Sequence, residues 1–119
     1  MKKFNIGDIV FVPHYRYKNG NEGKNHSFVI IDEEEAIDVN YFGLLISSHT
    51  EKATFPYNEE LNKNDINRLR ENSIVKCDDL IEFSNSEIQF KIGQVSEADL
   101  EKFVNTYLKY LDDTIGANV

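Results

Sequence analysis

The run Phe28-Val29-Ile30-Ile31 (FVII), which follows the polar segment Gly23-Lys24-Asn25-His26-Ser27 (GKNHS), decides the fold of this chain. Its four consecutive apolar residues predict a short strand that is covered on both faces. A strand of this kind needs neighbouring strands and a second layer packed against it. The polar segment raises a separate question, because a cation, an amide and an imidazole lie together where a loop becomes a buried strand.

The sequence on both sides of this run predicts further strands. They are expected where β-branched and aromatic residues are frequent, over residues 6–12, 41–47, 54–61, 73–83 and 87–92. Pro56 predicts that the segment 54–61 lies at an edge of the sheet. Residues 84–86 predict a hairpin between the last two strands. Residues 14–25 and the charged segment 32–38 are expected to be loops.

Two helices are predicted. Asn and Asp near the start of residues 62–72 indicate a short one. A longer helix is expected to begin at Ser96, which can cap it, followed by Glu97 and Asp99 at its positive end. Its apolar stripe consists of Leu100, Phe103, Val104, Tyr107, Leu108 and Leu111. The chain is therefore interpreted as one mainly β domain over residues 1–119, an antiparallel sheet or small barrel closed by a C-terminal helix, with 112–119 as a frayed tail.

Composition limits the classes of function. With 119 residues, 40% of them hydrophobic, the chain suits a single folded domain. Its start has two lysines but no apolar run, and its apolar stretches are too short for a membrane span, so a cytoplasmic protein is expected. Cys77 is the single cysteine and excludes an intramolecular disulfide. The net charge of −8 argues against nonspecific nucleic-acid binding over the whole surface.

One loop departs from this acidic character. Between positions 14 and 26, three cations stand against the single carboxylate of Glu22. Aromatic and basic side chains alternate there in the order His14, Tyr15, Arg16, Tyr17 and Lys18. Single-stranded nucleic acids bind such surfaces, because bases stack on the rings while cations follow the phosphates. The loop is a candidate RNA-binding element; the alternative is an exposed loop whose tyrosines lie on the sheet.

The order of these elements resembles the MazF/PemK (Kid-like) toxins of type II toxin–antitoxin systems. The matching segments are GDIVFV (7–12), FVII (28–31), LLISS (44–48), SIVKCDDL (73–80) and KIGQVSEADL (91–100). The resemblance implies a small SH3-like sheet or barrel, a homodimer and a cognate antitoxin. It also implies an endoribonuclease that cuts single-stranded RNA with no metal or other cofactor. Relatives of the same fold, such as CcdB, instead bind DNA gyrase and cleave nothing.

The resemblance also locates a site at the start of FVII. The family pattern has an arginine followed by a proline, and these two positions fall on Asn25 and His26. Asparagine cannot bring a positive charge to a phosphate. The family's hydroxyl residue falls on Ser47, which keeps the hydroxyl. Half of the expected pair is therefore present.

The residues at this site suggest a hypothesis for metal-free RNA cleavage, which needs proton transfer and stabilisation of a charged phosphorane. His26 is the candidate general base or acid, since imidazole changes its charge near neutral pH. Lys24 (or Arg16) is the candidate cation for the phosphorane. Ser47 or Ser48 would orient the phosphate. Asn25 would add a hydrogen-bond donor to the RNA-binding set.

Other interpretations of the same residues remain open. His26 is equally compatible with a hydrogen-bonded position at the edge of the core, and Ser47 and Ser48 with ordinary turn hydroxyls. The replacement of arginine by Asn25 favours a non-catalytic binding module on this fold, either a gyrase-directed toxin or a nucleic-acid-binding protein. A third alternative is an interaction protein that has kept only the scaffold.

Overall fold

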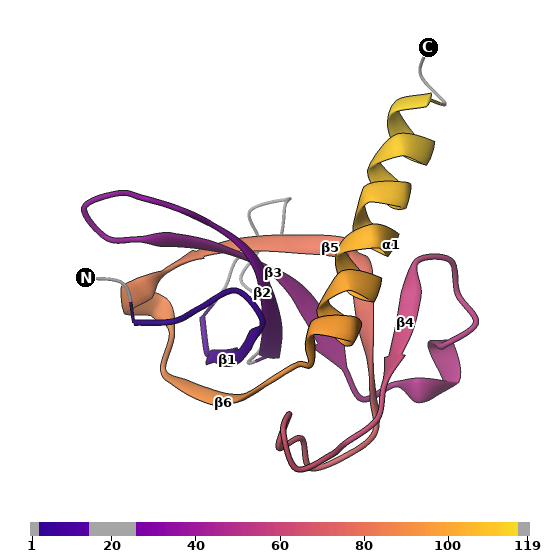
Figure 1. The fold of residues 1–119 in the computed structure, drawn as a ribbon, viewed down its shortest axis with the longest axis horizontal. Helices are drawn as coiled ribbons and strands as arrows, with labels where there is room; N and C mark the ends of the chain where they lie inside the picture. Colours follow the sequence, from indigo (N-terminus) through magenta and orange to yellow (C-terminus); the bar gives the residue numbers. More distant parts are fainter. Residues whose placement is uncertain (1–2, 15–25, 117–119) are drawn as a thin grey trace.

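The computed structural model describes residues 3–14 and 26–116, and this part of the chain forms a six-stranded antiparallel sheet with one long helix (Figure 1). The elements are β1 (Asp8–Val12), β2 (His26–Glu34), β3 (Asn40–Ser47), η1 (Thr50–Lys52), β4 (Asn58–Leu61), β5 (Ser73–Ser84), η2 (Asn85–Glu87), β6 (Phe90–Gln94) and α1 (Glu97–Gly116). The strand order is β4-β5-β3-β2-β1-β6, so the described sheet has two edges and is not a closed barrel. The mainly β class with a C-terminal helix is confirmed.

Strand β2 confirms that the FVII run is covered on both faces. Phe28, Val29 and Ile30 have no exposed surface. Phe28 and Ile30 belong to a hydrophobic cluster on one face of the sheet, whereas Val29 packs in a second cluster on the other face. Because successive side chains of a strand point to opposite faces, this single run contributes to both clusters. It thereby fixes β2 at the centre of the fold.

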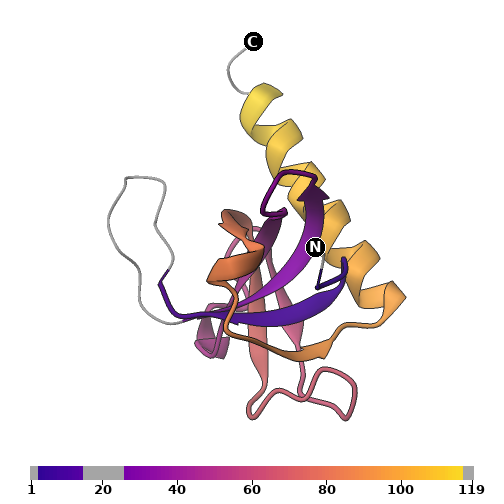
Figure 2. The same cartoon turned by 90° about the vertical axis from the view of Figure 1, so that its left-hand side faces the viewer.

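Helix α1 covers the second cluster. Phe103 is fully buried there, with Leu100 and Tyr107 packed beside it. Ser96 caps the helix as predicted, because its Oγ accepts a hydrogen bond of 3.1 Å from the Asp99 amide. Seen from two directions, the C-terminal half of α1 extends past the sheet (Figures 1 and 2).

The frayed tail predicted for residues 112–119 is helical as far as Gly116, and residues 117–119 lie outside the described part. A contact that the sequence does not reveal holds this end of the helix. The Tyr57 hydroxyl donates a hydrogen bond of 2.7 Å to Asp113 Oδ2, and the ring of Tyr57 packs edge-on against Tyr110 with centroids 5.2 Å apart. The hydrogen bond to Asp113 raises the pKa of the Tyr57 hydroxyl above its usual range.

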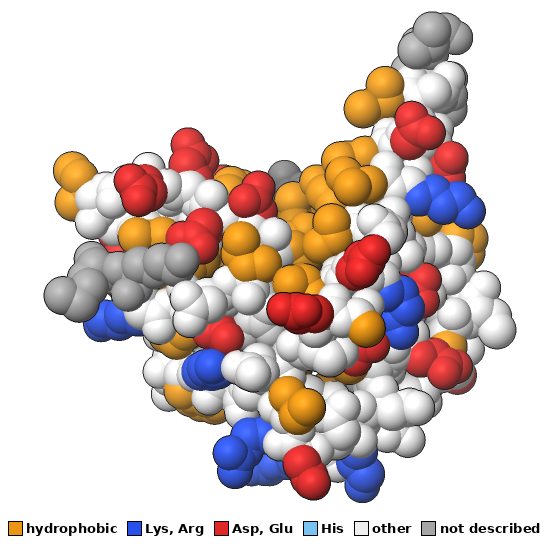
Figure 3. Space-filling view, in the orientation of Figure 1, with side chains coloured by type: hydrophobic (Ala, Val, Ile, Leu, Met, Phe, Trp, Pro, Cys, Tyr) orange, Lys and Arg blue, Asp and Glu red, His pale blue; other side chains and the backbone are white. Residues whose placement is uncertain are grey.

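An apolar groove lies between α1 and the sheet, where Figure 3 shows hydrophobic side chains gathered on the surface. We call it the α1 groove; it has a volume of about 320 Å³. Its lining consists of Ile31, Asp32, Phe42, Leu80, Val104, Tyr107 and Leu108. Leu108 is 52% exposed, so part of the predicted helical stripe is left uncovered in a single chain. Among the described residues, no helix combines the length and apolar character that a membrane crossing requires.

Three local predictions are wrong. Residues 84–86 do not join a hairpin: β6 pairs with β1, because β3 and β4 already occupy both sides of β5. The charged segment 32–38 is not entirely a loop, since β2 continues to Glu34 in a hairpin with β3. Residues 62–72 contain turns and no helix, for a reason that concerns the site.

Candidate functional site

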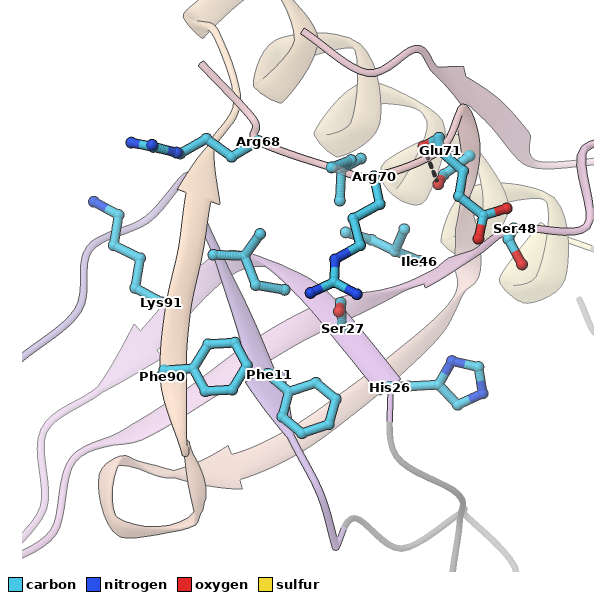
Figure 4. Close-up of a pocket in the computed structure, with 13 residues that line it drawn as sticks. Phe11, His26, Ser27, Ile46, Ser48, Arg68, Arg70, Glu71, Phe90 and Lys91 are labelled. Carbon is cyan, nitrogen blue, oxygen red and sulfur yellow. Dashed lines mark hydrogen bonds between the residues drawn. The ribbon is translucent and has the colours of Figure 1, made fainter. Parts of the chain in front are cut away.

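A pocket of about 760 Å³ opens on one face of the sheet, below the loop of residues 62–72 (Figure 4). We call it the basic pocket. Its floor is a row of side chains from four neighbouring strands, in the order Phe90, Phe11, Ser27 and Ile46. These residues lie opposite one another in the strand register, so their side chains share one face of the sheet. The loop supplies the wall, and the rest of the lining consists of His26, Ser48, Ser73, Lys91 and Ile92.

Three cations line the basic pocket. Arg68 and Arg70 come from the loop, and Lys91 comes from β6. In Figure 4 the guanidinium of Arg70 descends from the loop towards the middle of the pocket. The charge of Lys91 is partly compensated, because its Nζ lies 3.1 Å from Oδ1 of the buried Asp8. Within residues 3–14 and 26–116, neither arginine has a carboxylate within ion-pair distance, so both charges face solvent or a ligand.

The wall loop is held in place by asparagine side chains. Asn67 is 1% exposed; its Oδ1 accepts hydrogen bonds of 3.0 Å from the amides of Asn64 and Leu69. Its Nδ2 donates to the Asn62 carbonyl oxygen at 2.8 Å. Such local side-chain bonds offer the backbone an alternative to helical hydrogen bonding. They explain why this segment forms a structured loop where a helix was predicted.

Strand β6 fixes the same loop from the other side. A Cβ atom added at Gly93 would lie 2.4 Å from the Asn67 carbonyl oxygen, a distance that no real side chain tolerates. The Gln94 amide donates a hydrogen bond of 3.2 Å to the Ile66 carbonyl oxygen. Glycine at position 93 therefore allows the loop to rest directly on β6. This contact positions Arg68 and Arg70 over the pocket.

The structure brings two of the sequence-predicted residues into the basic pocket. His26 is half-buried at the start of β2 and lines the rim, and the exposed Ser48 follows the end of β3. Ser47, predicted to be catalytic, is absent from the described lining: it is 9% exposed and its Oγ accepts a hydrogen bond of 3.2 Å from the His49 amide. The alternation of a strand explains the difference, because Ile46 and Ser48 face the pocket and Ser47 faces away.

The remaining predicted residues cannot be assigned to the pocket. His14 is exposed just after β1 and is not part of the described lining. Lys24, Asn25, Tyr15, Arg16, Tyr17 and Lys18 lie outside the described residues.

Sequence reasoning missed most of the cationic and aromatic lining. Arg68 and Arg70 were placed on a predicted helix, and the Arg-Leu-Arg spacing within an asparagine-rich segment was the available signal for a loop that presents two cations. Glu71, the one carboxylate of the described lining, comes from the same loop. Phe90 and Lys91 reach the pocket only because β6 pairs with β1.

Two other chemistries find no support in the described residues. Burial raises the pKa of the Cys77 thiol to about 12, so this side chain is no thiolate nucleophile at neutral pH. No group of three or more His, Cys, Asp and Glu side chains within residues 3–14 and 26–116 is placed to hold a metal ion.

The antiparallel sheet with one C-terminal helix is consistent with the fold that the resemblance implies. Comparison with protein-family models matches residues 5–111 to the PemK-like, MazF-like toxin of type II toxin–antitoxin systems. The match covers nearly the whole chain, and the chain belongs to this family. Membership confirms the resemblance and implies an antitoxin partner. A search of curated proteins gave no match.

Proposed function

We propose that this toxin is an endoribonuclease that cleaves single-stranded RNA by metal-independent acid/base chemistry. The observation that supports it most is the lining of the basic pocket, which includes an imidazole, a hydroxyl and three cations. Phosphoryl transfer needs a proton carrier and positive charge at the phosphate, and these groups supply both.

In the proposed reaction, the 2′-hydroxyl oxygen of one nucleotide attacks the adjacent phosphorus and its proton passes to a general base. A bond from O2′ to phosphorus forms, the bond from phosphorus to O5′ breaks, and O5′ receives a proton from a general acid. His26 takes one of these two roles. Glu71 is the carboxylate of the described lining and is the candidate for the other. The products are a 2′,3′-cyclic phosphate and a free 5′-hydroxyl.

The wall loop supplies the positive charge that the family arginine would have brought to the phosphate. Arg70 reaches the pocket from the wall loop, and its guanidinium is suited to two phosphate oxygens at once. Ser48 takes the phosphate-orienting role that was predicted for Ser47 or Ser48. Lys24 or Arg16 adds further charge. The candidate RNA-binding set also includes Asn25, together with His14, Tyr15, Tyr17 and Lys18.

Purified protein is expected to cut single-stranded RNA in the presence of a chelator. The fragments should carry a 2′,3′-cyclic phosphate, detectable by mass spectrometry as a loss of water relative to the 3′-phosphate. A DNA strand of the same sequence is the control and should stay intact, because it lacks the 2′-hydroxyl. Uncut RNA, with or without added divalent ions, would contradict the proposal.

A non-catalytic function on the same fold is the second candidate, and the observation that favours it is Asn25 in place of the family arginine. Such a protein would act by binding, either as a gyrase-directed toxin or on a nucleic acid. Intact RNA together with inhibition of gyrase supercoiling would support this alternative.

We also propose that the protein acts in the cytoplasm as a homodimer until its antitoxin binds. The α1 groove leaves Leu108 exposed, and Asp112 and Asp113 lie further along the same helix, which has no basic residue in its last turn. An antitoxin segment that combines apolar anchors with basic residues fits this acidic body of net charge −8.

Light scattering of the purified toxin should give twice the mass of the 13.8 kDa chain, and a monomer at micromolar concentration would contradict the dimer.

A further inference from the structure

The basic pocket contains an aromatic pair that the proposed reaction does not use. Phe11 and Phe90 lie opposite each other on β1 and β6, with ring centroids 5.1 Å apart and planes inclined by only 13°. Phe90 is 48% exposed although it is part of the pocket floor. The exposed part of the Phe90 ring leaves apolar area in the pocket that a ligand can cover.

The surroundings of the pair indicate what it binds. Lys91 follows Phe90 in β6, and the wall loop carries Arg68 and Arg70. In Figure 4 the guanidinium of Arg70 extends towards the middle of the pocket, whereas the side chains of Arg68 and Lys91 extend past β6 on the other side. A flat apolar ring with a guanidinium beside it fits a nucleobase whose phosphate is bound next to it. It fits an apolar protein segment poorly, because such a segment would have to desolvate the arginines without pairing them.

We propose that Phe90, supported from behind by Phe11, is a base-stacking platform for the RNA strand. This inference rests on the proposed function and deepens it. The exposed face of Phe90 receives the base of a nucleotide next to the scissile bond, while its phosphate lies near Arg70. In the register, Phe90, Phe11 and Ser27 are neighbours across three strands, and His26 directly precedes Ser27. Stacking on Phe90 therefore directs the strand along this row towards β2, where His26 lies at the rim of the pocket.

The stacked geometry of the two rings also explains why Phe11 matters. Parallel stacking on Phe11 holds the Phe90 ring in one orientation, so that little side-chain freedom is lost when a base binds. A base adds to a stack that already exists in the free protein. Phe90 is thus a binding residue and Phe11 a positioning residue.

The chain has no tryptophan, so a single introduced indole reports on this site alone. We expect the emission of the Phe90→Trp variant to be quenched by a single-stranded RNA whose 2′-hydroxyls are methylated, which binds without being cleaved. The matched control is Phe55→Trp: Phe55 is 55% exposed and is not part of the described pocket lining. Its emission should not change with the same RNA.

Affinity gives the second measurement. Phe90→Leu keeps an apolar side chain against Phe11 but removes the ring, and its dissociation constant for the methylated RNA should rise about 5- to 100-fold. Phe90→Tyr keeps the ring and should bind like the parent. Thermal unfolding of each variant shows whether it is folded, and the tryptophan measurement stands even if the leucine variant is not.

Three outcomes would overturn the platform. The first is unchanged emission of Phe90→Trp with RNA, and the second is parent-like RNA affinity of Phe90→Leu; if the parent still cleaves RNA, the proposed function survives alone. The third is emission of Phe90→Trp that responds to protein concentration and not to RNA, which would assign the surface to an interface between copies of the chain. A parent that neither binds nor cleaves RNA overturns both proposals.

Discussion

Substitution of His26 by alanine is expected to slow RNA cleavage by about 10²- to 10⁴-fold, the usual contribution of a positioned general acid or base. The imidazole lines the rim of the basic pocket at the first residue of β2. Its removal leaves the three cations of the lining in place. RNA binding should therefore change little, and the loss should fall on kcat.

His26→Gln is the companion variant, because glutamine keeps a polar side chain of similar reach but carries no exchangeable ring proton. It should be nearly as slow as His26→Ala. A role in proton transfer further predicts that the pH–rate profile of the parent contains a limb that both variants lack. Single-turnover cleavage of a labelled RNA, measured across pH, checks this. A variant that cleaves at the parental rate would show that the imidazole has only a structural role at the edge of the core.

The centre of the fold could be predicted from the sequence because its signal is local. The FVII run specifies a strand buried on both faces, and Ser96 with the apolar stripe behind it specifies the helix. Strand pairing is not local. Nothing in residues 84–94 indicates that β6 crosses to β1, since that choice is made by β3 and β4 occupying both sides of β5.

The candidate site was half predictable for the same reason. His26 and Ser48 stand at strand ends that the hydrophobic pattern locates directly. Arg70 depends on a loop whose shape is set by the hydrogen bonds of the buried Asn67 and by the space above Gly93. The contact at Gly93 joins β6 to a loop that precedes it in the chain, and no periodicity within either segment encodes it.

Arg70 carries the other large effect that we expect. Arg70→Ala should reduce kcat by about 10²- to 10³-fold, the cost of removing one preorganised donor from a developing negative charge. The guanidinium is free of ion pairs among the described residues and the side chain is exposed, so its loss should not destabilise the fold. Equal melting temperatures of variant and parent would verify that point.

Two further variants separate the contribution of the Arg70 charge from that of the guanidinium geometry. Arg70→Lys keeps the positive charge but loses the planar fork that binds two oxygens, and should recover only part of the rate. Lys63→Ala removes a charge from the same loop at a position that is not part of the described lining, and should cleave almost as the parent does. If Lys63→Ala and Arg70→Ala were equally slow, the loop would act only through its overall positive field, which salt screens. If Arg70→Ala were as fast as the parent, the guanidinium that replaces the family arginine would have to come from elsewhere in the chain, with Arg68 and Arg16 as the next residues to test.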